Sequence, residues 1–196
     1  MLNDKSALRS RLSAARAAMS PEQRQRAGAA LGRRALELLP ARLPAQPPAV
    51  VAGYVSMGTE PDTRALLDAL RARGARVLLP LLQPDNDLDW GEYRGAEHLV
   101  AARLGLREPD GEPLGADAVC GADLVLMPGL AVDRRGVRLG RGGGSYDRVL
   151  ARLAAGGSGA LLVTLLYDDE VLAEVPAEAH DRPVDAAVTP SKLWRF

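Results

Sequence analysis

The chain has 196 residues, of which 47% are hydrophobic and 26% are charged. This length and composition fit one compact domain, because globular domains usually contain about 100–200 residues. The 25 basic residues balance the 25 acidic residues, so the formal net charge is +0. The chain therefore lacks the general excess of positive charge that binds nucleic acid or an anionic membrane, and any anion site must be local.

The cysteine content and the N-terminus both indicate a cytoplasmic protein. Cys120 is the only cysteine, which excludes an internal disulfide and a zinc site built from several cysteines. The first residues carry charges at Asp4, Lys5, Arg9 and Arg11 and lack the apolar core of a signal peptide. No later stretch approaches the roughly 20 apolar residues of a membrane span. We expect a cytoplasmic protein, and a monomer.

The first forty residues are predicted to form two helices. Apolar residues recur at helical spacing at positions 8, 12, 15 and 19, and Ser20-Pro21 marks a break and a new helix start. Four prolines from Pro40 to Pro48 then predict a linker.

Short apolar runs that alternate with helical segments predict a parallel β/α architecture. Residues 49–55, 76–79, 123–128 and 161–165 have the composition of buried strands. Helices are predicted after Thr63 and from Tyr146 to Ala155, and the stretch 88–111 favours edge strands and loops. We predict one α/β domain over residues 1–196, in which helices of residues 1–40 pack on a core with a central, mainly parallel sheet flanked by helices.

The most informative stretch, called the glycine loop below, runs from Arg138 to Asp147. Four of the five residues from 140 to 144 are glycine, and a helix is predicted to follow. Without Cβ atoms, successive N–H groups can turn inward around phosphate oxygens, and the start of the next helix adds partial positive charge. Arg138 and Arg141 can supply full charges, and Asp147 offers an oxygen ligand to a magnesium ion that bridges phosphates.

The glycine loop is neither a Walker A loop nor a dinucleotide fingerprint. It lacks Gly-Lys-Ser/Thr, and Ser145 stands where the third glycine of a fingerprint would follow Gly140 and Gly142. On glycine content alone, the alternative is a tightly turned connector with incidental arginines. Three adjacent glycines flanked by arginines favour the phosphate site.

A longer pattern surrounds the glycine loop, from Met127 to Arg148. It reads Pro-Gly, then hydrophobic-Asp at Val132-Asp133, then Arg-Leu-Gly-Arg-Gly-Gly-Gly-Ser-Tyr-Asp-Arg. This pattern resembles the hallmark of the 5-formyltetrahydrofolate cyclo-ligase family, also called methenyltetrahydrofolate synthetases. Further matches at residues 5–9, 54–60, 104–109 and 180–185 follow the family order, so the resemblance spans nearly the whole chain.

The resemblance implies an ATP-dependent ligase that converts 5-formyltetrahydrofolate to 5,10-methenyltetrahydrofolate, releases ADP and phosphate, and requires Mg²⁺. Phosphorylation of the formyl oxygen turns the formyl carbon into an electrophile that N10 attacks. The protein must mainly align two substrates and neutralise phosphate charge. The resemblance also implies the sugar-isomerase and coenzyme A transferase-like α/β fold.

Family correspondence implies a role for each matched residue. The expected catalytic residues are Arg141 and Tyr146, and the expected magnesium ligands are Asp147 and Asp181. Folate binding is expected at Val55, Glu60, Arg141, Gly142, Gly143, Gly144 and Ser145. ATP binding is expected at Lys5, Ser6, Ala7, Leu8, Arg9, Arg138, Leu139, Gly140, Arg141, Gly142, Gly143, Gly144, Ser145 and Tyr146.

The cationic and folate-side assignments have structural alternatives. Lys5 and Arg9, one helical turn apart, also fit a solvated basic face. Val55 also fits a plain core residue, and Glu60 also fits a carboxylate that a helix dipole stabilises.

The carboxylates and the histidine have alternatives too. Asp147 could pair with Arg148 or Arg141, and Asp181 could form a turn before Pro183. For Asp133 we favour a structural turn. His180 receives no catalytic role, because a lone histidine in a loop is more often structural.

Two departures from the family pattern keep other functions open. Ser145 replaces the first tyrosine of the run, and Val132 replaces a phenylalanine whose ring is expected to stack on folate. These changes motivate an alternative function, a non-catalytic nucleotide- or folate-binding regulator of the same fold. A third function, a sugar-phosphate isomerase-like enzyme, needs a general base that faces the loop, and the sequence places none.

Overall fold

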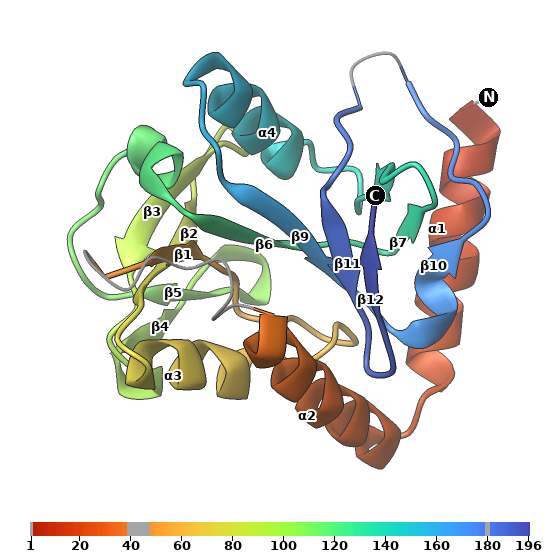
Figure 1. Ribbon diagram of the computed structural model, residues 1–196, viewed down its shortest axis with the longest axis horizontal. Helices are drawn as coiled ribbons and strands as arrows, with labels where there is room; N and C mark the ends of the chain where they lie inside the picture. The colour runs from red at the N-terminus through yellow and green to blue at the C-terminus, as the bar shows by residue number, and fades with distance from the viewer. Residues whose placement is uncertain (1, 39–47, 179–180) are drawn as a thin grey trace.

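A mainly parallel sheet runs through the centre of the computed structural model (Figure 1). The structure describes residues 2–38, 48–178 and 181–196, and within them this sheet has seven strands. Strands β1, β2, β6, β9 and β11 are parallel, while β3 and β12 are antiparallel strands at the two edges. In sheet order the strands are β12 (Leu193–Arg195), β11 (Ala186–Val188), β9 (Leu161–Leu165), β6 (Leu124–Pro128), β1 (Val50–Ala52), β2 (Arg76–Leu82) and β3 (Leu88–Glu92).

Helices cover both faces of this sheet (Figure 1). They are α2 (Pro21–Leu38), α3 (Arg64–Ala72) and α4 (Ser145–Ala155), whereas α1 (Leu2–Ala18) packs on a second, smaller sheet. Along β6, Leu124 and Leu126 pack in the core beneath α2 and α3, whereas Val125 and Met127 pack beneath α4. This alternation buries both faces of the strand, which explains why its sequence is a continuous apolar run. The predicted α/β fold class is confirmed.

A small second sheet supports the glycine loop. It has the order β10 (Val171–Leu172), β7 (Ala131–Asp133), β8 (Arg138–Leu139). The antiparallel pairing of β7 with β8 places Arg138 opposite Val132 at the entrance to the loop. Helix α1 packs on this sheet, because Leu8 and Leu12 share a hydrophobic cluster with Leu139.

The remaining elements are short. A separate hairpin consists of β4 (Leu99–Ala101) and β5 (Arg107–Pro109). Within the described residues, four 3-10 helices connect the larger elements: η1 (Ala96–His98), η2 (Arg103–Gly105), η3 (Ala116–Gly121) and η4 (Asp168–Glu170).

The helices and strands predicted from the sequence agree with the structure more closely than the predicted loops and edge strands do. The two N-terminal helices and the four buried strands lie where they were predicted. The predicted edge region divides into β3, which is an edge of the main sheet, and the separate β4–β5 hairpin. The linker predicted at Pro40–Pro48 falls mostly outside the described residues, as does His180.

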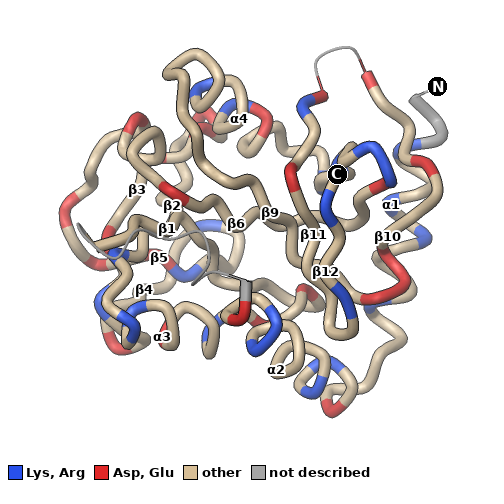
Figure 2. Tube along the Cα trace, in the orientation of Figure 1, with Lys and Arg blue, Asp and Glu red and all other residues tan. Residues whose placement is uncertain are grey.

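Charge is distributed around the described chain. Figure 2 shows Lys and Arg interspersed with Asp and Glu along the trace. Among the described residues, none of the helices is long and apolar enough to cross a membrane.

Candidate functional site

A cleft opens at the carboxyl edge of the parallel strands. Its floor comes from residues that end or follow β1, β2 and β6, including Val55, Leu82 and Gly129, and the glycine loop lies across from them. The cavity volume is about 260 Å³. Ligands of open α/β sheets bind at this edge, so the position fits a substrate site. The cleft brings together Val55, Glu60 and the glycine loop, which the sequence had assigned to one site.

The shape of the glycine loop depends on glycine at two positions. Gly142 has φ +97° and Gly144 has φ +75°, in a region that residues with a Cβ rarely adopt. At Gly142 a Cβ would stand 3.5 Å from the guanidinium carbon of Arg9. Gly144 is the N-cap of α4, so the partial positive charge of that helix begins at the wall of the cleft.

Arg138 is the buried cation of the loop. Its side chain is 6% exposed, its Nη2 lies 2.9 Å from Asp147 Oδ1, and its Nη1 donates to the Pro128 carbonyl at 3.2 Å. The guanidinium carbon also lies 5.9 Å from the centroid of the Tyr146 ring. Burial lowers the pKa of Arg138, and the nearby Asp147 partly opposes this effect. Arg138 Nε is buried without a partner among the described residues, which leaves a donor for a ligand.

Glu60 and Arg141 face each other across the cleft. Arg141 Nε lies 3.2 Å from Glu60 Oε1, and Glu60 Oε2 accepts the Met57 N–H at 2.8 Å. The Glu60 side chain is 8% exposed and that of Arg141 is half-exposed. The side chain of Glu60 is thus held in place by both oxygens, although it borders the cavity.

Two tyrosines stand beside Glu60. Burial, together with the nearby carboxylate, raises the pKa of both the Tyr54 and the Tyr146 hydroxyl. Both phenols therefore keep their protons at neutral pH and can donate hydrogen bonds. Neither hydroxyl has a hydrogen-bond partner within the described part of the chain.

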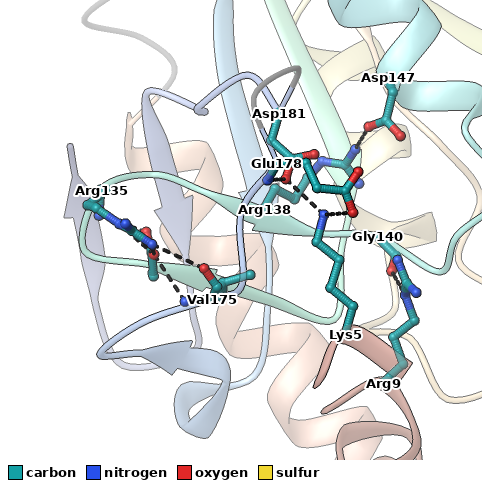
Figure 3. A network of polar contacts seen from close by, with 10 residues as sticks. Lys5, Arg9, Arg135, Arg138, Gly140, Asp147, Val175, Glu178 and Asp181 are labelled. Atoms are coloured by element: carbon teal, nitrogen blue, oxygen red, sulfur yellow. Dashed lines mark hydrogen bonds and ion pairs between the residues drawn. The ribbon is translucent and has the colours of Figure 1, made fainter. Parts of the chain in front are cut away.

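Two cations of α1 contact segments from the other end of the chain: Lys5 contacts Glu178 and Asp181, and Arg9 contacts the glycine loop (Figure 3). Lys5 Nζ lies 2.9 Å from Asp181 Oδ2 and 3.1 Å from Glu178 Oε1. Arg9 Nε donates to the Gly140 carbonyl at 2.9 Å. Burial alone would lower the pKa of Lys5, but its hydrogen bonds with Asp181 and Glu178 outweigh that effect and raise it. The Lys5 side chain is 13% exposed, which does not fit the alternative of a freely solvated basic face.

The two expected magnesium ligands lie on either side of Arg138 (Figure 3). Asp147 pairs with Arg138. The structural alternative considered from the sequence was a pair with Arg148 or Arg141, but those residues pair with Asp85 and Glu60. Asp181 accepts from Lys5 and also from the Glu178 N–H at 2.7 Å. Among the described residues, no group of three or more His, Cys, Asp and Glu side chains is arranged as a metal site. Protein ligands alone therefore do not complete a coordination shell here, and phosphate oxygens and waters are needed.

Asp133 holds the turn that leads into the glycine loop. Its Oδ1 accepts the N–H groups of Arg135 and Val137 at 2.8 and 3.1 Å, and its Oδ2 accepts the Val175 N–H at 3.1 Å. Arg135 Nη2 adds an ion pair at 2.7 Å. Burial raises the pKa of Asp133, but these hydrogen bonds outweigh it and the net shift is downward. The structural turn favoured from the sequence is what the structure shows.

Val132, which stands where the family has a phenylalanine, lies in the core and away from the cleft. Its side chain is fully buried and packs with Val149 in the core beneath α4. It is absent from the described lining of the cleft, whereas Ser145 is part of it. The expectation that a ring at position 132 stacks on folate is therefore wrong, because this position faces the core.

Sequence reasoning missed the apolar wall of the cleft. Leu88, Leu104 and Leu106 line the cavity, and the Leu104 side chain is 73% exposed. Leucine carries no chemical signature of a ligand site, so only the folded position identifies these residues. The family match at residues 104–109 pointed to this segment, but no role was assigned to it from the sequence.

Comparison with known proteins settles the family. The sequence model of the 5-formyltetrahydrofolate cyclo-ligase family matches residues 1–190. The chain belongs to this family.

Individual relatives agree with this assignment. The 5-formyltetrahydrofolate cyclo-ligase of Mycolicibacterium smegmatis is 48% identical over 147 residues, which cover 72% of this chain and 74% of the relative. That of Escherichia coli is 33% identical over 187 residues, which cover 92% and 97% of the two chains. The solution structure of the Aquifex aeolicus 5,10-methenyltetrahydrofolate synthetase has a TM-score of 0.80 at 29% identity, covering 97% of this cyclo-ligase family member and 92% of that chain.

We expect Asp133→Asn to lower the free energy of unfolding by about 3 kcal/mol at pH 7, because an amide replaces the charged acceptor of buried N–H groups. The folded-state pKa of Asp133 is lowered. Its stabilisation is therefore complete above the unfolded-state pKa of about 3.9 and is lost as the pH falls through the lower folded-state value. Urea denaturation from pH 7 to pH 3 measures the difference between the two proteins.

The matched control for this experiment is Asp169→Asn, which changes an exposed carboxylate. It should leave the free energy of unfolding within about 0.5 kcal/mol of the original protein at every pH. A penalty for Asp133→Asn that stays constant below pH 4 contradicts the ionic role of Asp133.

Proposed function

We propose that this protein uses ATP to convert 5-formyltetrahydrofolate to 5,10-methenyltetrahydrofolate, with release of ADP and phosphate. Membership of the cyclo-ligase family supports the reaction. The observation that carries it for this chain is that the glycine loop and the Glu60 turn line one cleft, while Arg9 of α1 contacts the same loop. A non-catalytic regulator is not favoured, because the family and the relatives that match this chain are cyclo-ligases.

The nucleotide phosphates are proposed to bind at the glycine loop. Lys5, Arg9 and Arg138 bring three positive charges to this loop, and its glycines leave backbone N–H groups accessible. In the structure, Lys5 is paired with Asp181, Arg9 with a backbone carbonyl and Arg138 with Asp147. Phosphate oxygens can replace those partners, so the charges are already positioned before ATP binds.

The folate is proposed to bind on the opposite side, with its pterin ring at Glu60. The buried carboxylate can accept hydrogen bonds from the N–H groups of the ring, and Val55 and Leu88 offer apolar contact. Leu104 and Leu106 cover the outer part of the same wall. The formyl group then lies between Glu60 and the glycine loop, where the nucleotide's γ-phosphate is also expected.

The chemistry requires two consecutive displacements. The formyl oxygen attacks the γ-phosphorus, a new O–P bond forms, and the bond to ADP breaks. N10 then attacks the formyl carbon, the C–N bond forms, phosphate leaves with the formyl oxygen, and N10 loses its proton. Arg141 is the proposed catalytic cation for the transferred phosphoryl group, and the protonated Tyr146 hydroxyl is a proposed donor to the same oxygens.

We also propose that Mg²⁺ accompanies ATP and that Asp147 and Asp181 are its protein ligands. The residues fit this ion, because two carboxylates suffice for a hard cation that keeps water and phosphate oxygens as ligands. When bound, the ion supplies charge neutralisation at the phosphates. Binding would also release Arg138 and Lys5 from their present carboxylate partners. A cytoplasmic monomer remains part of the proposal.

A turnover assay tests the proposed reaction. Purified protein given 5-formyltetrahydrofolate, ATP and Mg²⁺ should produce the ultraviolet absorbance of methenyltetrahydrofolate and an equal amount of ADP. Glu60→Gln should raise KM for the folate about tenfold and leave KM for ATP within about twofold, because Glu60 lies on the folate side. Folded protein that binds both substrates and forms no ADP contradicts the enzyme and supports the regulator.

The metal proposal has a separate test. Asp147→Asn should raise the Mg²⁺ concentration for half-maximal turnover roughly tenfold, because a neutral amide is a weaker ligand than a carboxylate. Asp85→Asn, which changes an exposed carboxylate beside Arg148, is the matched control and should change nothing. An unchanged magnesium dependence in Asp147→Asn removes this residue from the metal site.

A further inference from the structure

A buried ion pair lies behind the cleft, in a place that sequence reasoning did not single out. Arg16, near the end of α1, is 1% exposed. Its Nε and Nη2 lie 2.6 and 2.8 Å from the two carboxylate oxygens of Glu170. The same Nη2 donates to the Gly129 carbonyl at 2.7 Å, and Gly129 lines the cleft. Arg16 therefore ties α1 directly to the cleft wall.

Tyr167 extends this contact to the Glu60 turn. The guanidinium carbon of Arg16 lies 5.5 Å from the centroid of the Tyr167 ring, and the Tyr167 N–H donates to Glu170 Oε2 at 2.8 Å. The Tyr167 hydroxyl donates to the Thr59 carbonyl at 3.1 Å. Thr59 immediately precedes Glu60 in the chain. The contacts between Arg16 and Glu170 are buried, and the bond between Tyr167 and Thr59 is partly buried, so solvent competes little with them.

The turn that carries Glu60 is attached to the core at two places. At its base, the Thr63 hydroxyl donates to the Tyr54 carbonyl at 2.7 Å and accepts the Ser56 N–H at 2.9 Å. Nearer Glu60, the bonds between Met57 and Glu60 are internal to the turn, so the Tyr167 bond is the attachment beside Glu60. Gly58, in the middle of the turn, is exposed and has φ +56°. The bond from Tyr167 fastens the backbone of this turn to the core.

The contribution of these contacts among Arg16, Glu170 and Tyr167 to the stability of the fold does not explain why polar residues occupy these buried positions. A buried ion pair recovers little of its desolvation cost, and well-packed apolar side chains in its place are often as stable or more stable. Here Arg16 Nη1 and the nearby Tyr54 hydroxyl are also buried without a hydrogen-bond partner among the described residues. Apolar side chains could fill the same space, but they could not form the directional hydrogen bonds that Arg16 makes with Glu170 and Gly129.

We propose that Arg16 and Tyr167 are positioning residues that hold Glu60 at the folate side of the cleft. Lys5 and Arg9 lie near the start of helix α1, where Arg9 contacts the glycine loop and Lys5 contacts Asp181. Arg16 lies near the end of the same helix, where it contacts Tyr167. One helix thus sets the distance between the nucleotide cations and the carboxylate that binds the pterin. This inference rests on the proposed function, since it assigns Glu60 to folate.

Tyr167→Phe tests the inference with the loss of one oxygen atom. KM for the folate should rise about 3- to 10-fold, the size expected when one hydrogen bond is lost. KM for ATP and the melting temperature should stay close to those of the original protein. Tyr93→Phe is the matched control, because it removes another buried hydroxyl, bonded to Asp68 Oδ1 at 2.6 Å away from the cleft. It should leave both KM values unchanged.

A double variant shows whether Tyr167 acts through Glu60. In the Glu60→Gln protein, adding Tyr167→Phe should change KM for the folate by less than about twofold, because the positioned carboxylate is already lost. If Tyr167→Phe raises KM for the folate as much in the Glu60→Gln protein as in the original protein, the inference is overturned. An equal rise in KM for folate and ATP in the single Tyr167→Phe variant also overturns it.

Arg16→Lys keeps the charge and removes the two-pronged contact with Glu170. It should raise KM for the folate in the same direction as Tyr167→Phe, and an unchanged KM in a folded protein contradicts the role of Arg16. If the unmodified protein shows no turnover, the proposed function fails. Folate binding by calorimetry then still tests the network, and equal affinities in the original protein and Tyr167→Phe overturn it.

Discussion

The hydrogen bond from Arg9 to the Gly140 carbonyl joins two segments 131 positions apart, and the site depends on this junction. The glycine loop has no lysine of its own and provides N–H groups together with Arg138 and Arg141. Under the proposed function, Lys5 and Arg9 in the first turns of α1 add two further positive charges. Leu8 and Leu12 pack α1 on the small β10-β7-β8 sheet, so the cations are placed by apolar packing rather than by the loop.

The balance of charge around the site follows from the same arrangement. The chain as a whole has no net charge, and the cations around the cleft have local carboxylate or carbonyl partners. Arg138 pairs with Asp147, and Lys5 pairs with Asp181. Under the proposed function, phosphate oxygens replace these carboxylates and release them. The proposed magnesium ligands are thus the same groups that keep the cations satisfied before substrate binds.

The parts of the site that local chemistry dictates could be predicted from the sequence. Gly142 and Gly144 have the positive φ angles that a tight phosphate loop requires, and Asp133 forms the turn that its sequence context favoured. The pairing of Arg16 with Glu170 could not be predicted, because the partners are 154 positions apart and neither belongs to a recognisable motif. Val132 was misjudged for a related reason. Its place in a motif says nothing of which side of β7 faces the cleft, and packing in the core decides that.

The central claim is that α1 and the glycine loop form one nucleotide site. Hydrogen–deuterium exchange with and without ATP and Mg²⁺ measures this most directly, because it reports each segment separately. The account predicts that backbone amides in residues 138–147 and in the first turns of α1 slow together when nucleotide binds. Slower exchange in the glycine loop alone, with α1 unchanged, would contradict it.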